Sequence, residues 1–127
     1  MEYTGKRAWL YMRIDAPEDT HGALKGQEKE LYDYSEHMGL SIAGSSSDLD
    51  SGSDDSNKRG LEQVIAAALD GKFDILLLKS SDRLYRDVGR ITGIIRQLNE
   101  IGVTVCSPTE GEIKPDVPTF ATMEVLP

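Results

Sequence analysis

Three arginines and one acid stand at places in the sequence where they could handle a phosphate group. Arg13 and Asp15 close a short apolar run, and Arg83 and Arg86 follow a second apolar run much later in the chain. Attack on a phosphodiester adds negative charge to a group that is already anionic, and guanidinium groups around it can stabilise that charge. Arg13, Arg83 and Arg86, together with the carboxylate of Asp15, are therefore the residues whose chemistry suits a phosphate where the fold brings the two segments together.

Short strand-like runs alternate with longer helical ones, which predicts βαβ units and a mostly parallel sheet. The expected strands cover residues 8–14, 41–44, 73–78 and 103–106, and the expected helices cover about 24–38, 59–69 and 87–101. With right-handed crossovers these elements form an α/β three-layer sandwich whose sheet has four to five strands. Functional groups of such folds collect beyond the carboxyl ends of the strands, which is where Arg13, Asp15 and residues 80–86 would lie.

Apolar residues at helical spacing are expected to pack the helices on the sheet. They include residues near the helix ends, namely Leu24, Leu69, Val88 and Ile101.

Residues 45–57 predict a mobile loop, because a run of Ser, Asp and Gly offers little apolar surface to bury. The acids of this run could suggest a calcium loop, but an EF-hand needs Gly at its sixth position and Glu at its twelfth. Counted from Asp48, those positions hold Ser53 and Arg59. We therefore expect a solvated loop without a metal.

Composition fits one globular domain of 127 residues, 39% apolar and 28% charged. The single cysteine, Cys106, excludes an internal disulfide and indicates a reducing, cytoplasmic setting, and it is expected to be a small core residue. No apolar run approaches the roughly 18–20 residues that span a bilayer, and the start of the chain does not resemble a signal peptide. The net charge of −8 argues against broad coating by nucleic acid, so any DNA contact must come from a local basic site or from a further segment.

Five short motifs follow one another along residues 7–106. They are Tyr11-Met12-Arg13-Ile14-Asp15, Leu24 with Gln27, Ser51-Gly52, Lys58-Arg59-Gly60-Leu61 and Asp82-Arg83-Leu84-Tyr85-Arg86-Asp87. In this order they resemble the catalytic domain of the serine recombinases, the resolvase/invertase family. The last motif is the strongest match, because it directly follows the expected buried strand, as Asp-Arg-Leu-x-Arg-Asp does in that family. Two positions depart from the pattern: Asp15 stands where the family has its nucleophilic serine, and Lys58 where it usually has an arginine.

The resemblance implies a resolvase-like fold and site-specific DNA recombination through a covalent 5′-phosphoserine link, in a protein that belongs to a mobile element. It assigns the phosphate cradle to Arg13, Arg83 and Arg86. Asp82 would pair with these arginines and orient them, and Gln27 would be a further catalytic residue.

Lys58 and Arg59 would add contacts to DNA phosphates, although a lysine lacks the planar fork of an arginine. The resemblance also implies DNA as a partner and a homodimer or higher oligomer, with no cofactor, metal, membrane or small-molecule substrate. Residues 1–110 would form the catalytic domain. Family members continue into a long helix that makes the dimer contact, so residues 111–127 are expected to be a linker or the truncated start of that helix.

Asp15 predicts that strand exchange is impaired in this chain. A carboxylate among guanidinium groups can form bidentate ion pairs that occupy the groups meant for phosphate. Its charge would also repel a phosphate by about 4 kcal/mol at a separation of roughly 4 Å and an effective dielectric constant near 20. If the carboxylate itself attacked, water would cleave the resulting acyl phosphate, and the DNA would be nicked instead of rejoined.

Two other classes of protein stay open. A non-catalytic subunit could pair with an active recombinase and regulate it or serve in assembly. A phospho-acceptor receiver domain has a similar length and order of elements, but it needs an aspartate directly after the third strand, where this chain has Lys79 and two serines.

Overall fold

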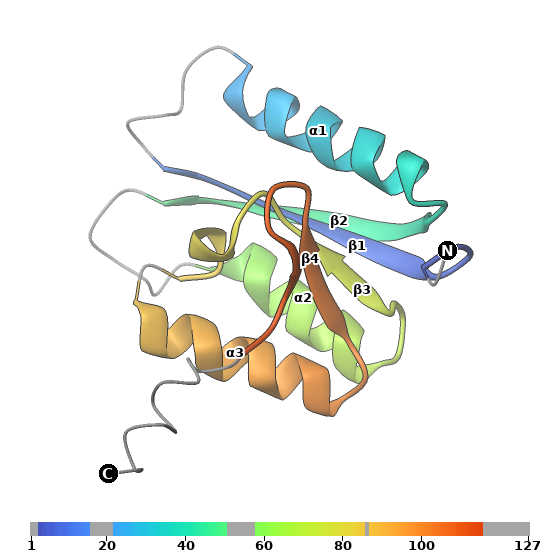
Figure 1. Ribbon diagram of the computed structural model, residues 1–127. Coiled ribbons are helices and arrows are strands. Elements are labelled where there is room, and N and C mark those ends of the chain that lie inside the picture. The colour runs from blue at the N-terminus through green and yellow to red at the C-terminus, as the bar shows by residue number, and fades with distance from the viewer. Residues whose placement is uncertain (1–2, 16–21, 51–57, 86, 116–127) are drawn as a thin grey trace, which may run out of the picture.

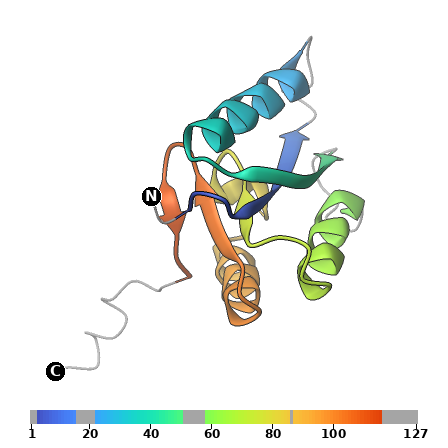
Figure 2. The ribbon, with the colours of Figure 1, turned by 90° about the vertical axis from the view of Figure 1, so that its right-hand side faces the viewer.

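The fold is a five-stranded sheet with helices on both faces (Figures 1 and 2). The computed structural model describes residues 3–15, 22–50, 58–85 and 87–115. The strands are β1 (Arg7–Asp15), β2 (Ser41–Asp50), β3 (Ile75–Leu77), β4 (Thr104–Ser107) and β5 (Gly111–Ile113). The helices are α1 (Ala23–His37), α2 (Arg59–Leu69) and α3 (Val88–Glu100), with a short 3-10 helix, η2 (Ser81–Arg83), after β3.

The sheet has the order β2-β1-β3-β4-β5. The strands β1 to β4 pair in parallel, and β5 pairs antiparallel with β4. The predicted three-layer α/β sandwich with a mostly parallel sheet is therefore confirmed. None of the helices in the described ranges has the length and apolar character needed to cross a membrane.

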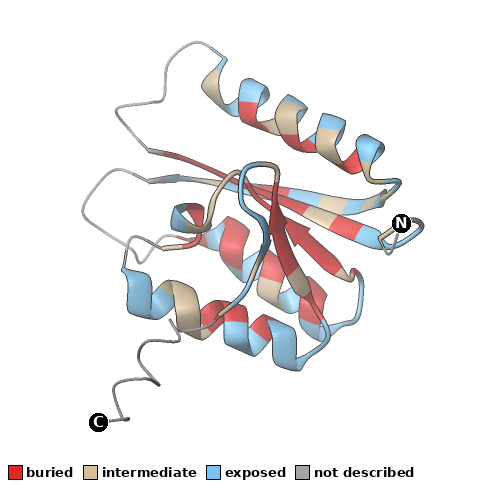
Figure 3. Cartoon of the chain, viewed as in Figure 1, coloured by how far each residue is buried: buried red, intermediate tan, exposed pale blue. Residues whose placement is uncertain are grey.

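Two apolar cores lie on opposite faces of the sheet, and β1 contributes alternate residues to both (Figure 3). Leu10 and its same-face neighbours pack with Leu31 of α1, whereas Tyr11 packs with α2 and α3 on the other face. Cys106 is buried in the core under α1, as the sequence predicts.

The apolar residues at the helix ends do not join these cores. The structure leaves exposed Leu24, Leu69, Val88 and Ile101. The prediction that they are buried against the sheet is wrong, because each lies in the first or last turn of its helix or just past it, where the side chain stays open to solvent.

The strand β2 is longer than its sequence suggests. The predicted strand ends at residue 44, but β2 stays paired with β1 as far as Asp50, so residues 45–50 are not a loop. Backbone pairing with β1 stabilises this serine-rich half, and Ser46 is buried between the indole N–H of Trp9, which donates to its hydroxyl at 3.0 Å, and the carbonyl of Gly60 at 2.8 Å. The rest of the predicted loop, residues 51–57, lies outside the described residues.

A hairpin ends the described part of the chain. The sequence predicts a linker from residue 111, whereas residues 111–113 form β5. The Ser107 hydroxyl accepts hydrogen bonds from the N–H groups of Thr109 and Glu110, which stabilises the turn between β4 and β5. Residues 116–127, where the sequence predicts a linker or a helix start, lie outside the described residues.

Gly60 allows α2 to begin directly against β2. A Cβ atom at this position would lie 2.4 Å from the carbonyl oxygen of Ser47, a distance that no side chain tolerates. The glycine of the Lys58-Arg59-Gly60-Leu61 motif is therefore a packing requirement of the seam between α2 and β2.

We predict that Gly60→Ala lowers the free energy of unfolding by about 1–3 kcal/mol, because the added methyl group must push α2 away from β2. Urea unfolding followed by circular dichroism measures this change. The matched control is Gly26→Ala in α1, where a Cβ meets nothing within 4 Å and should raise stability by about 0.5–1 kcal/mol. Equal effects of the two substitutions would show that the close approach at Gly60 does not matter.

Candidate active site

The end of β1 and the 3-10 helix η2 meet at the carboxyl edge of the sheet. The Nη1 atom of Arg83 donates a hydrogen bond to the carbonyl oxygen of Arg13 at 3.1 Å, although 70 positions separate the two residues. Both arginines are buried, with 2% and 8% of their surface exposed for Arg13 and Arg83 respectively. This proximity follows from the parallel pairing of β1 with β3, which brings the segments after both strands to one edge.

Gln27 of α1 also contacts the main chain of Arg13. Its Oε1 atom accepts a hydrogen bond from the Arg13 N–H at 3.2 Å, and its Nε2 atom donates to the Arg13 carbonyl at 3.4 Å. Because Gln27 is buried, this double contact fixes the main chain of Arg13 against α1. Its geometry is that of a residue that holds Arg13 in place.

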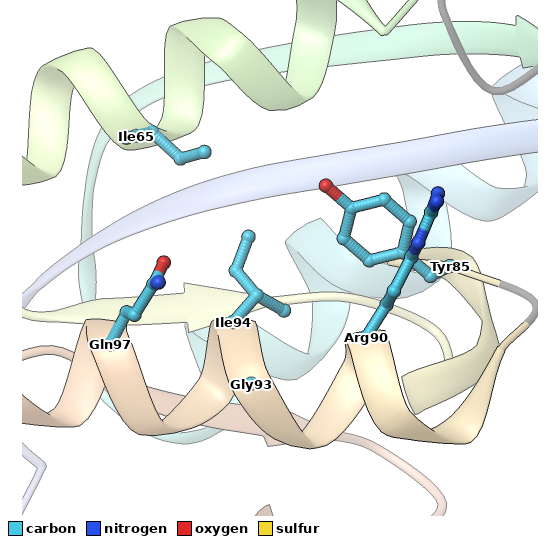
Figure 4. A pocket seen from close by; sticks show the side chains of 6 residues that line it. All are labelled: Ile65, Tyr85, Arg90, Gly93, Ile94 and Gln97. Atoms are coloured by element: carbon cyan, nitrogen blue, oxygen red, sulfur yellow. The ribbon is translucent and has the colours of Figure 1, made fainter.

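Lys58 approaches this edge from the start of α2. It is buried, with 7% of its surface exposed, and its ammonium group lies 5.4 Å from the ring centroid of Tyr85. The guanidinium group of Arg90, in the first turn of α3, lies 5.7 Å from the same centroid (Figure 4). Arg59, the other predicted phosphate ligand on this segment, is exposed.

Asp48 is a residue whose importance the sequence does not predict. Its carboxylate accepts hydrogen bonds from the Tyr11 hydroxyl at 2.7 Å and from the N–H groups of Gly60 and Leu61 at 2.7 and 3.0 Å. Asp48 therefore joins β1, β2 and α2, and it sets the position of Lys58 just before the helix. A signal for it exists in the sequence: Lys58 cannot cap α2, so the free N–H groups at the helix start need an acceptor from elsewhere.

Burial and the contact with Asp48 also act on Tyr11. Loss of water around the hydroxyl is the larger cause, followed by the hydrogen bond to the Asp48 carboxylate, and together they raise the pKa of Tyr11 well above its ordinary value. Tyr11 therefore stays neutral and donates to Asp48 across the whole range in which the protein is expected to work.

The other predicted site residues are less fully described. The carboxylate of Asp82 is exposed and accepts a hydrogen bond from the Ser80 hydroxyl, so its pairing with the arginines stays a prediction. Asp15 is the last residue of β1 and pairs in register with Asp50, but its side chain is not described. Arg86 and the Ser51-Gly52 pair lie outside the described residues. Within those residues, no group of acids, histidines or cysteines could hold a metal ion.

Comparison with protein families gives a match to the model described as "Resolvase, N terminal domain" over residues 8–125. The chain belongs to this family. Membership in the resolvase family implies site-specific recombination as the class of activity. A comparison with curated proteins found no match.

Solved structures share the fold of this resolvase-family domain. The N-terminal catalytic domain of TP901-1 integrase is 20% identical with a TM-score of 0.73, over 95% of this chain and 87% of that one. The C-terminal catalytic domain of ISC1926 TnpA, an IS607-like serine recombinase, is 23% identical with a TM-score of 0.70, over 94% and 77% of the two chains. A resolvase family site-specific recombinase from Streptococcus pneumoniae is 15% identical with a TM-score of 0.75, over 95% and 85%.

We predict that Gln27→Ala lowers the free energy of unfolding by about 1–3 kcal/mol, since it leaves the buried N–H of Arg13 without its acceptor. Chemical unfolding measures the loss. The control is Glu36→Ala on the exposed part of the same helix, for which we expect a change within about 0.5 kcal/mol. A Gln27 variant as stable as this control would contradict the role assigned to the amide.

We predict that Tyr11 makes the protein less stable in alkaline solution. Because folding raises the pKa of Tyr11 above its ordinary value of 10.0, the unfolded chain releases this proton first. The contribution is complete below pH 10 and is lost as the pH rises above it, by up to about 1.4 kcal/mol per pH unit. Urea unfolding at a series of alkaline pH values gives the free energy of unfolding as a function of pH. This free energy should fall less steeply with pH for Tyr11→Phe than for the wild type. The control Tyr32→Phe, at an exposed position, should keep the wild-type pH dependence.

Proposed function

We propose that this chain is the catalytic domain of a serine recombinase type of protein that acts on DNA, with Arg13, Arg83 and Arg86 as its phosphate cradle. The observation that carries the proposal is the contact of the Arg83 guanidinium group with the main chain of Arg13 at the carboxyl edge of the sheet. Guanidinium groups gathered at one point can stabilise the charge that develops on an attacked phosphodiester.

In the proposed mechanism the buried positions of Arg13 and Arg83 matter as much as their charge. Little water surrounds these side chains, so their interaction with an incoming phosphate would be stronger than in bulk solvent. Gln27 holds the main chain of Arg13, and Arg83 donates a hydrogen bond to the same main chain, so the backbone of Arg13 and the guanidinium group of Arg83 are fixed before DNA arrives. Lys58, just before α2, would add a further cation at this edge of the sheet.

Asp15 occupies the position of the family's nucleophilic serine, and we propose that it impairs strand exchange. A carboxylate there cannot form a phosphoserine link, and its charge opposes the phosphate that the arginines attract. The same substitution favours a second candidate function, in which the domain assembles with an active recombinase as a non-catalytic subunit. Both functions use the same fold.

Asp15→Ser should restore covalent linkage to DNA if the rest of the site is intact. We suggest joining the domain to the DNA-binding region of an active relative and incubating it with that relative's recombination site. Covalent protein–DNA product, measured by denaturing gel electrophoresis, is expected to rise from background to a clear band, because the substitution supplies the missing hydroxyl group. It also removes an electrostatic penalty of about 4 kcal/mol, which by itself corresponds to roughly a thousandfold.

The matched control is Asp15→Ala, which removes the charge without adding a hydroxyl group. It should bind the DNA as Asp15→Ser does and form no covalent product. Abundant covalent product from the wild-type chain would refute the proposed impairment. A folded Asp15→Ser protein that binds the site but forms no product would favour the non-catalytic subunit.

A further inference from the structure

Tyr85 brings together two cations from different elements. It stands at the variable position of the Asp82-Arg83-Leu84-Tyr85-Arg86-Asp87 motif, two residues after the buried Arg83. The Lys58 ammonium group, at the start of α2, and the Arg90 guanidinium group, on α3, lie 5.4 and 5.7 Å from the centroid of its ring. Figure 4 shows the Arg90 side chain extended alongside the ring.

The elements that carry the two cations are held in place independently of the ring. Hydrogen bonds from Gly60 and Leu61 to Asp48 fix the start of α2, which directly follows Lys58. The Asp87 side chain accepts a hydrogen bond from the Arg90 N–H at 3.0 Å and so caps the start of α3. The convergence of the two cations on Tyr85 is therefore a property of the fold.

An aromatic ring can offset the repulsion between two like charges. The negative face of the ring attracts a nearby cation by about 0.5–1 kcal/mol at exposed sites and by about 2 kcal/mol where water is excluded. Lys58 is largely shielded from water, which places it near the upper end of this range. Two cations gathered in this way attract an anion more strongly than either does alone.

We propose that Tyr85 is a positioning residue that holds Lys58 and Arg90 as a second phosphate contact, for a DNA backbone phosphate next to the one at the Arg13–Arg83 site. The inference rests on the proposed function, since it takes DNA as the substrate. A DNA strand carries one phosphate for about every 3.4 Å of helix axis, so a protein that holds one phosphate is within side-chain reach of its neighbours. An open cavity of about 340 Å³ between α2 and α3 is lined in part by Tyr85 and Arg90, so the Arg90 side of the ring is accessible.

The Tyr85 ring also compensates for the presence of a lysine, Lys58, where the family usually has an arginine. An arginine presents a rigid planar fork, whereas the ammonium group of Lys58 is a point charge on a flexible stem. A ring face beneath the ammonium group restricts that flexibility. Tyr85 would thus give Lys58 the fixed orientation that the side chain lacks by itself.

The salt dependence of DNA binding tests this inference. We would measure the affinity of the protein for a short duplex of mixed sequence by NMR titration at several low salt concentrations. The slope of log K against log salt is about −0.9 for each phosphate contact. Arg90→Gln should make the slope shallower by about 0.9, because one phosphate contact is lost. Tyr85→Leu should make it shallower by up to about 1.8, because both cations lose the ring. Tyr85→Phe should keep the wild-type slope because it keeps the ring.

Arg96→Gln is the matched control, because Arg96 is also an exposed arginine of α3 but is not among the residues that contact the Tyr85 ring. It should leave the slope unchanged, and thermal unfolding should show that every variant is folded. If Tyr85→Leu or Arg90→Gln leaves the slope at its wild-type value while Arg83→Gln weakens binding, the second contact is refuted and the proposed function stands. If the wild-type protein binds no duplex even at the lowest salt concentration, the second contact is refuted, and the covalent-linkage test of Asp15→Ser then decides the proposed function.

Discussion

The main chain of Arg13 is the point on which the candidate site depends. Its N–H group donates to Gln27, and its carbonyl oxygen accepts hydrogen bonds from both Gln27 and Arg83. Buried backbone groups at the end of a strand need partners when the sheet no longer supplies them. Here side chains from α1 and η2 supply those partners, so the contacts that complete β1 also fix the guanidinium group of Arg83 beside it.

A second set of polar contacts fixes the start of α2 against β2. Asp48 receives the first N–H groups of this helix, and Ser46 donates to the carbonyl of Gly60, while the absent side chain of Gly60 lets the backbones approach. Lys58 directly precedes this seam and takes its position from it. The cations of the edge are thus placed by hydrogen bonds between elements, and the apolar cores provide the rigid frame behind them.

The sequence predicts the apolar parts of the fold well and the polar parts poorly. The helix at residues 59–69 and the buried strand around Ile75–Leu77 follow from apolar spacing, and the meeting of Arg13 with Arg83 follows from the rule for parallel sheets. The second half of β2 has serines and acids without apolar alternation, because its stability comes from pairing with β1 and from buried polar contacts. The role of Tyr85 could not be predicted either, since one of its two cations precedes α2 and the other lies on α3, and only the folded chain defines the distance between them.

The position of β2 in the sheet has a consequence for how copies of the chain behave at high concentration. In the described part of the chain β2 has a neighbour on one side only, so a strand of 10 residues offers its other side to any extended polypeptide. Long edge strands of this kind promote aggregation when they are flat and apolar. The serines and aspartates of β2 keep its edge hydrated, and the register irregularity opposite Ala8 and Trp9 bends it. The net charge of −8 also makes copies of the chain repel one another.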